Sequence, residues 1–162
     1  MSFHLWGSEG TTEHGHNYYE IFLVTDGRIC HEINGKISEI SKGTLCMICP
    51  GDIHQLRRIE NFSSIHMNIC LSPKKFEEIC SALGIYSKEF EAQKPLTAAL
   101  STEEQAYFAS RASLINRLIS DGYEKAASVI CSTASDFISI INSSKLTQKI
   151  DCPEWFENML EK

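Results

Sequence analysis

The feature that most constrains the fold is a series of short apolar segments, separated by turns, in the first 71 residues. The segments are rich in aromatic and β-branched residues, and they recur at the spacing typical of antiparallel strands. Asp26-Gly27 and Asn34-Gly35 are hairpin signals, and Pro50-Gly51-Asp52 marks a further turn. This pattern predicts an antiparallel sandwich or barrel. The expected strands are 18–25, 28–33, 36–40, 44–49, 54–59 and 64–70.

Beyond residue 71 the pattern becomes helical. Ser72 can cap a helix that begins at Pro73 and ends at Gly84. Residues 85–100 lack periodicity and are expected to form a loop, whereas 101–104 form a capping box that begins a helix ending at 121–122. A broadly apolar helix should follow and end at 142–144, and Pro153 should open a last amphipathic turn.

Charge and composition exclude several classes of protein. Fifteen Lys and Arg against 21 Asp and Glu give a net charge of −6, so the chain is poorly suited to bind the phosphates of a nucleic acid. No apolar run approaches the ~20 residues of a membrane span, and the N-terminus lacks the pattern of a secretory signal. The seven scattered cysteines suggest reduced thiols. We therefore expect a cytoplasmic chain that contacts no membrane and does not itself bind DNA.

The candidate site combines three imidazoles and one carboxylate. His14, His16 and Glu20 have the same parity, so on a strand they would share one face, and His54 follows the 50–52 turn. Such a ligand set suits Zn, Fe, Ni or Mn. The alternative is that these side chains line a pocket and hydrogen-bond to one another or to an organic ligand.

These residues resemble the two motifs of the cupin family. His14-x-His16-x3-Glu20-x6-Gly27 matches the first motif in full. The second, from Gly43 through Pro50-Gly51-x-x-His54, matches in part, because Cys49 takes the usual proline position and Arg58 the final asparagine position. The resemblance implies a mainly β cupin barrel (a double-stranded β-helix or jelly roll).

A longer stretch, HGHNYYEIFLVTDGRICHEINGKISEISKG…CPGDIHQ followed by IHMNICLSPKKFEE, resembles the N-terminal sensor domain of AraC/XylS-family transcription regulators. It is most similar to the type that regulates the diacetylchitobiose operon. The resemblance implies a barrel at 1–71, a helical and dimerising segment at 72–150, and at 151–162 the start of a linker to a DNA-binding domain of two helix-turn-helix units. Nothing in this chain resembles those units.

The resemblance also implies a small-molecule effector inside the barrel and a homodimer formed by the outer helices. An eight-stranded barrel is wide enough for one small ligand. Tyr18, His66 and Asn68 could hydrogen-bond the hydroxyls of a sugar, although the last two could instead face outward. Arg57 or Arg58 could reach an anionic group or remain solvated. The expected dimer contacts, if this helix is not buried on its own barrel, are Tyr107, Phe108, Leu114, Ile115, Leu118 and Ile119.

These observations favour an effector-sensing domain without enzymatic activity. Effector binding would favour one of two arrangements of barrel, helices and linker, and so change the affinity for an operator. The alternative is a small metal-dependent cupin enzyme of the dioxygenase or sugar isomerase type. A plain dimerisation module with an empty pocket would explain the helices but not the four converging polar residues.

Overall fold

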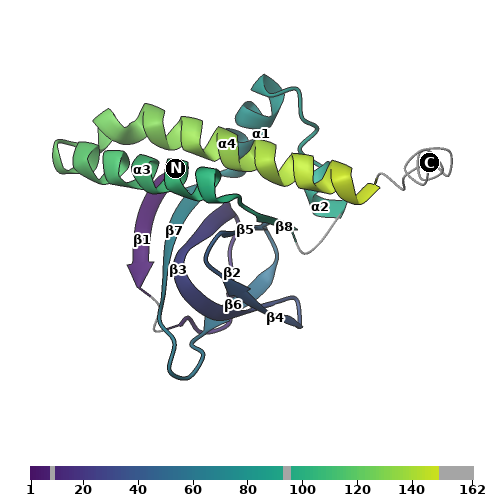
Figure 1. The fold of residues 1–162 in the computed structure, drawn as a ribbon. Coiled ribbons are helices and arrows are strands. Elements are labelled where there is room, and N and C mark those ends of the chain that lie inside the picture. The colour runs from purple at the N-terminus through teal and green to yellow at the C-terminus, as the bar shows by residue number, and fades with distance from the viewer. Residues whose placement is uncertain (8–9, 93–95, 150–162) are drawn as a thin grey trace, which may run out of the picture.

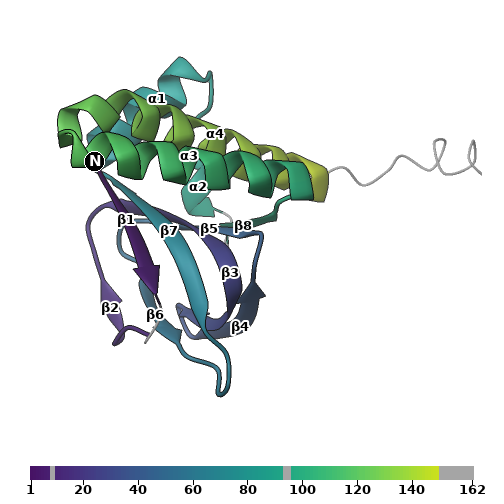
Figure 2. The ribbon, with the colours of Figure 1, turned by 60° about the vertical axis from the view of Figure 1, so that its left-hand side comes forward.

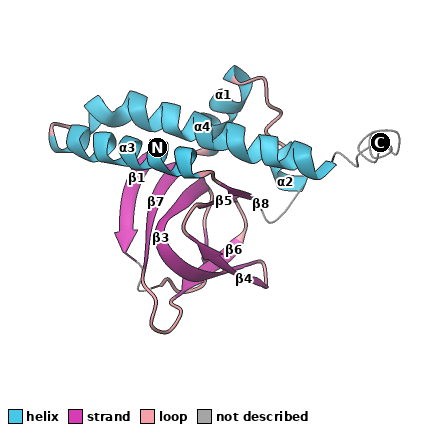
Figure 3. Cartoon of the chain, in the orientation of Figure 1, coloured by secondary structure: helices cyan, strands magenta, loops and turns pink. Residues whose placement is uncertain are grey.

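The computed structural model describes residues 1–7, 10–92 and 96–149 of the chain. Within them, antiparallel strands form a barrel, and the helices lie together on one side of it (Figures 1 and 3). The strands are β1 (Ser2–Gly7), β2 (His14–Gly15), β3 (Tyr19–Ile33), β4 (Lys36–Ser41), β5 (Thr44–Ile48), β6 (Ile53–Arg57), β7 (Ser64–Leu71) and β8 (Leu96–Ala99). The helices are α1 (Pro73–Ala82), α2 (Glu89–Ala92), α3 (Thr102–Ser120) and α4 (Tyr123–Lys149).

The long strand β3 belongs to both walls of the barrel. Its first part pairs with β5 and β7 in a sheet of order β1-β7-β3-β5-β8, and its last part pairs with β4 and β6. The register shifts between Val24 and Asp26, where a bulge bends the strand from one wall to the other. Gly27 follows with φ +70°, and a Cβ atom there would lie 1.8 Å from the carbonyl oxygen of Ser63. The hairpin predicted at Asp26-Gly27 is therefore wrong, because the chain needs a bend there rather than a reversal.

The bulge changes which residues face the interior of the barrel. Before it the even-numbered Phe22 and Val24 point inward, and after it the odd-numbered Ile29 and Ile33 do. These residues join Ile40, Cys46, Ile48 and Leu56 in a buried apolar cluster. Part of the barrel interior is therefore filled with apolar side chains.

The opposite face of the β1-β7-β3-β5-β8 sheet packs against the helices. Ile21, Leu45 and Ile69 point away from the barrel interior and join a larger core with Phe108 and Phe137. The hairpin of α3 and α4 lies over this face, as Figure 2 shows from the side. None of the described helices is both long and apolar enough to cross a bilayer.

The local helix signals were mostly correct. The Ser72 side chain accepts from the backbone N–H of Lys75, and Ser101 and Glu104 form the predicted capping box. The predicted end of the last helix at 142–144 is wrong, because α4 continues to Lys149. Within it, the hydroxyls of Ser143 and Ser144 donate to carbonyl oxygens four residues earlier, which accommodates both serines in the helix. The predicted loop at 85–100 instead contains α2 and β8, and the turn at Pro153 lies outside the described residues.

Candidate functional site

A cavity of about 700 Å³ opens into the barrel, and Leu56 of the apolar cluster is one of its lining residues. Strands β1, β3, β6 and β7 supply most of its walls, and the start of α1 closes one side. Its polar lining consists of Ser2, His4, Thr11, His14, Asn17, Tyr18, Glu20, His54, His66, Asn68, Cys70 and Ser72. A volume of this size suits a small organic ligand.

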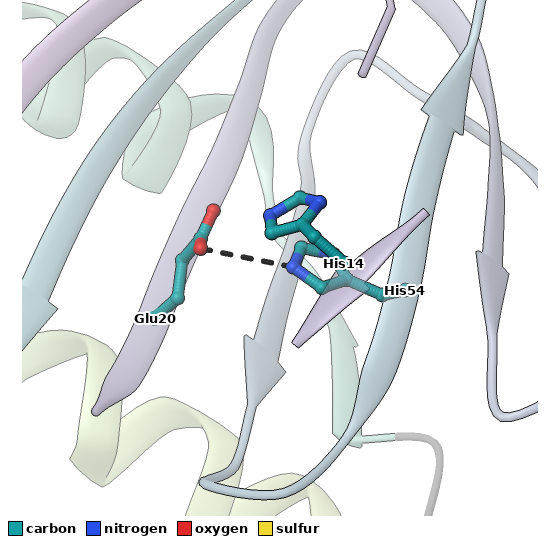
Figure 4. Close-up of side chains that lie close together, drawn as sticks. All are labelled: His14, Glu20 and His54. Carbon is teal, nitrogen blue, oxygen red and sulfur yellow. Dashed lines mark ion pairs between the residues drawn. The ribbon is translucent and has the colours of Figure 1, made fainter. Parts of the chain in front are cut away.

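Three of the four predicted metal ligands form a compact group. The nearest donor atoms of His14, Glu20 and His54 all lie within 4.8 Å of one another. His14 and His54 are directly paired across β2 and β6, and Glu20 faces them from β3 (Figure 4). The fourth residue, His16, places Nε2 3.1 Å from Glu20 Oε2. The structure therefore brings all four predicted side chains together.

Contacts with backbone carbonyl oxygens determine which ring nitrogen of His14 and of His16 is available to bind a metal. His14 Nδ1 lies 2.8 Å from the carbonyl oxygen of Thr12, and His16 Nδ1 lies 2.8 Å from that of Tyr18. A carbonyl oxygen only accepts, so Nδ1 carries the hydrogen in both rings and Nε2 of a neutral ring presents a lone pair. His16 Nε2 and the Glu20 carboxylate would then be two facing acceptors. Two acceptors 3.1 Å apart repel each other unless a proton or a cation lies between them. The set of imidazole nitrogens and a carboxylate fits a divalent metal.

His54 is suited to metal ligation because it remains neutral. Its side chain is 2% exposed, and neither ring nitrogen has a hydrogen-bond partner. Burial, with smaller effects of the neighbouring imidazoles, lowers the pKa of His54 to about 3. Its Nε2 lies 3.9 Å from Glu20 Oε2, the contact marked by the dashed line in Figure 4.

Three of the four predicted effector residues line the cavity. Tyr18 stacks on the ring of His16 with centroids 4.0 Å apart, and His66 and Asn68 are buried on β7. The outward alternative for His66 and Asn68 is therefore wrong. Arg57 does not line the cavity: it is exposed and forms an ion pair with Glu32.

Two further histidines, His4 and His31, lie in or beside the cavity and were not predicted from the sequence. His31 is buried inside the barrel, with its ring centroid 5.8 Å from that of His54, and burial lowers its pKa to about 4. The alternation Ile29-x-His31-x-Ile33 was the signal, because it places the histidine on the apolar face. His4 lines the cavity from β1, a strand that the sequence pattern did not indicate. All six histidines of the chain thus lie in or beside the cavity.

The predicted dimer contacts on α3 divide into two groups. Phe108 and Ile115 are 1% and 0% exposed, because they belong to the core beneath the helices. The prediction that Phe108 and Ile115 contact a second chain is therefore wrong, because both are core residues. The other four predicted residues keep exposed surface: Tyr107, Leu114, Leu118 and Ile119.

Comparison with known proteins places the chain in a regulator family. Residues 4–128 match the family model described as the AraC-like ligand binding domain. HTH-type transcriptional activator RhaS of Escherichia coli (strain K12 / DH10B) is 28% identical over 83 residues, and so is RhaS of Shigella boydii serotype 18. The match covers 51% of this chain but only 30% of either relative.

The arrangement of a barrel followed by helices is shared with a solved structure that covers most of this chain. An apo form of ToxT from Vibrio cholerae has a TM-score of 0.60 at 11% identity, covering 88% of this chain and 55% of ToxT. A predicted oxalate decarboxylase from Thermotoga maritima has a TM-score of 0.41 at 20% identity, and the match covers 43% of this chain and 64% of the decarboxylase chain. Because the family model spans most of the sequence, the chain belongs to the family of AraC-like ligand-binding domains.

Proposed function

We propose that this chain is the effector-sensing and dimerisation domain of a bacterial AraC-family transcription regulator, and that its effector is a carbohydrate-like small molecule bound in the barrel. The observation that carries the proposal is a set of buried polar atoms without hydrogen-bond partners around the cavity. They include Nε2 of His31, both ring nitrogens of His54, Nδ1 of His66 and Oδ1 of Asn68. Each such atom costs about 1–3 kcal/mol when unpartnered, and a polar ligand would recover part of that cost.

The cavity contacts the elements that would transmit a signal. Ser72 and Pro73, at the start of α1, line it, and so does Met1. The carbonyl oxygen of Met1 accepts a hydrogen bond of 3.1 Å from the hydroxyl of Tyr123, the first residue of α4. A ligand that favours one arrangement of these contacts would bias the helical layer. A coupling of about 1–3 kcal/mol would change operator affinity roughly 5- to 150-fold.

DNA recognition and dimerisation belong to the same proposal. Operator binding would require a separate C-terminal helix-turn-helix domain, as the names of the curated relatives suggest. The partly exposed α3 side chains of Tyr107, Leu114, Leu118 and Ile119 would contact a second copy of the chain. These side chains lie on α3, which packs against α4, so a partner would contact the outside of this helical hairpin.

A divalent metal is a further part of this proposal. His14, Glu20 and His54 would hold Zn, Ni, Mn or Fe, with His16 alongside. A bound ion would supply a fixed positive charge for oxygen atoms of the effector. Within the chain, Asn68 would hold the carboxylate in place, and the backbone carbonyls of Thr12 and Tyr18 would fix the rings. Elemental analysis of untagged protein tests the site, and less than about 0.1 metal per chain after incubation with Zn, Ni or Mn would remove it.

The sensing function is tested by a thermal-shift screen of mono- and disaccharides. A ligand at 100 times its Kd adds about 2.7 kcal/mol to the free energy of unfolding, which raises Tm by several degrees. His66→Phe should lose the response because its ring nitrogen faces the cavity, and Arg57→Ala should keep it as the matched control. A response to none of the sugars would contradict a carbohydrate effector.

A further inference from the structure

We propose that Asn34 and Asp52 form a positioning pair for the candidate metal site, because together they fix the connection that leads into His54. This inference rests on the metal site of the proposed function and adds two residues that do not themselves bind the ion. Asn34 lies in the turn between β3 and β4, and Asp52 lies in the connection between β5 and β6. The two residues are 18 positions apart in the sequence, and their side chains join the two turns.

Asp52 is a buried acid whose two side-chain oxygens have different partners. Asp52 is 2% exposed. Its Oδ2 accepts a hydrogen bond of 2.8 Å from the backbone N–H of Cys49, and its Oδ1 accepts one of 2.8 Å from the side-chain amide of Asn34. A buried oxygen of this kind is costly to leave without a donor, so the two bonds together hold the β5–β6 connection in one conformation.

Asn34 completes the pair through its contacts with Ile53. The backbone N–H of Asn34 donates to the carbonyl oxygen of Ile53 at 2.8 Å, and Asn34 Oδ1 accepts from the N–H of Ile53 at 3.0 Å. Because that N–H can only donate, the amide oxygen of Asn34 must face it, and the amide nitrogen must face Asp52. Asn34 has a φ of +49°, a conformation that asparagine and aspartate adopt more readily than other residues with a side chain. The pair therefore holds the two residues that directly precede His54.

The connection held by this pair supports three of the four candidate ligands. His54 begins just after it, and His14 is paired with His54 across β2 and β6. Within the connection, the N–H of Gly51 donates a hydrogen bond of 3.1 Å to the carbonyl oxygen of His16. A shift of the connection would therefore move these three imidazoles relative to Glu20, which lies on β3. Groups that orient metal ligands in this way contribute to metal affinity without touching the ion.

An exchange of the two side chains tests the pair directly. In Asp52→Asn, the new amide nitrogen faces either the amide nitrogen of Asn34 or the N–H of Cys49, so one hydrogen bond is lost. In Asn34→Asp, two carboxyl groups face each other. In the double variant Asn34→Asp/Asp52→Asn, the amide and the carboxylate have changed places. All three side-chain hydrogen bonds can then form again, and the bond between the two side chains runs in the opposite direction.

Zinc affinity of the full chain is measured by competition with a chelator of known affinity, and the absorption spectrum of the Co²⁺-loaded chain reports the geometry of the ligands. We expect each single variant to bind zinc about 10- to 100-fold more weakly and to alter the Co²⁺ spectrum. The double variant should return to within about threefold of the natural affinity and regain the natural spectrum. Asn61→Asp is the matched control, because Asn61 is an exposed asparagine with a φ of +64° that does not line the cavity.

Urea unfolding in EDTA, carried out on every variant, separates positioning from a purely structural role. Single variants that lose stability but keep the natural zinc affinity and Co²⁺ spectrum would overturn the inference, and so would a double variant that binds zinc as weakly as the single ones. In both cases the natural chain still binds zinc, so the proposed metal site would stand. A natural chain that binds no zinc would overturn both. Asn34→Asp changes an exposed turn residue, so it provides the comparison even if Asp52→Asn does not fold.

Discussion

The side-chain amide of Asn68 donates a 2.7 Å hydrogen bond to Glu20 Oε1 between strands β7 and β3. Asn68 is paired with Phe22, so it is the diagonal neighbour of Glu20 within the sheet. The bond orients the buried carboxylate so that Oε2 faces His16 and His54 at 3.1 and 3.9 Å. Asn68 on β7 thus holds Glu20 of β3 in place, and the geometry of the candidate metal site depends on both strands.

We expect Asn68→Leu to weaken metal binding by about 10- to 100-fold, because it removes the group that orients the carboxylate. Competition with a chelator of known zinc affinity measures the effect. Arg57→Ala is the control, since its side chain lies outside the cavity, and it should bind zinc as the natural chain does. Equal affinities for the natural chain and Asn68→Leu would show that the hydrogen bond does not support the site.

Stability should fall on acidification because His31 is buried in its neutral form. Its pKa is lowered to about 4, against an unfolded value near 6.5. Above pH 6.5 the ring is neutral in both states, so the full stability is present. Between pH 6.5 and 4 the unfolded chain binds a proton that the folded chain does not, so unfolding becomes more favourable as the pH falls.

The loss attributable to His31 should be roughly 1–2 kcal/mol between pH 6.5 and 5. Urea unfolding of the natural chain and of His31→Leu, both in EDTA, measures it. His31→Leu should lose less stability over this interval, since it lacks one of the groups that bind a proton on unfolding. The same pH dependence in both proteins would refute the assignment.

The bend in β3 should be intolerant of a side chain at Gly27. An alanine there would combine a φ of +70° with a Cβ atom 1.8 Å from the carbonyl oxygen of Ser63. We expect Gly27→Ala to destabilise the fold by more than about 2 kcal/mol. Gly35 has a similar φ of +77° but no atom within 4 Å of an added Cβ. Gly35→Ala should therefore cost only about 1 kcal/mol, and equal midpoints of chemical unfolding for the two variants would contradict the steric argument.

The sequence predicted those features that depend on local chemistry. Ser72 and Ser101 cap helices through bonds to residues three positions away, so a short window of sequence contains all the necessary information. The inward position of Glu20 followed from the two-residue alternation of a strand. The position of His54 just after a turn also allowed its role to be predicted.

The remaining features depend on contacts that are distant in the sequence. Residues 14–20 do not form one strand; His14 reaches the site because it pairs with His54, forty residues away. The bulge after Val24 depends on the close approach of Ser63. After the bulge the odd-numbered residues face inward instead of the even-numbered ones, and this places His31 inside the barrel. The apolar stripe of α3 did not reveal which side faces its own core, because burial of Phe108 and Ile115 depends on α4 and the sheet.

Self-association through α3 should depend on Leu114, which lies seven residues after Tyr107 and four before Leu118 on one side of the helix. A charge in a dimer contact would have to be desolvated, so Leu114→Glu should raise the dimer dissociation constant by at least about tenfold. Sedimentation velocity over a range of protein concentrations measures this change. Ser113→Glu is the matched control, because Ser113 is exposed at the adjacent position and faces another side of α3. A natural chain that stays monomeric, or a dimer that both variants leave intact, would contradict dimerisation through this face.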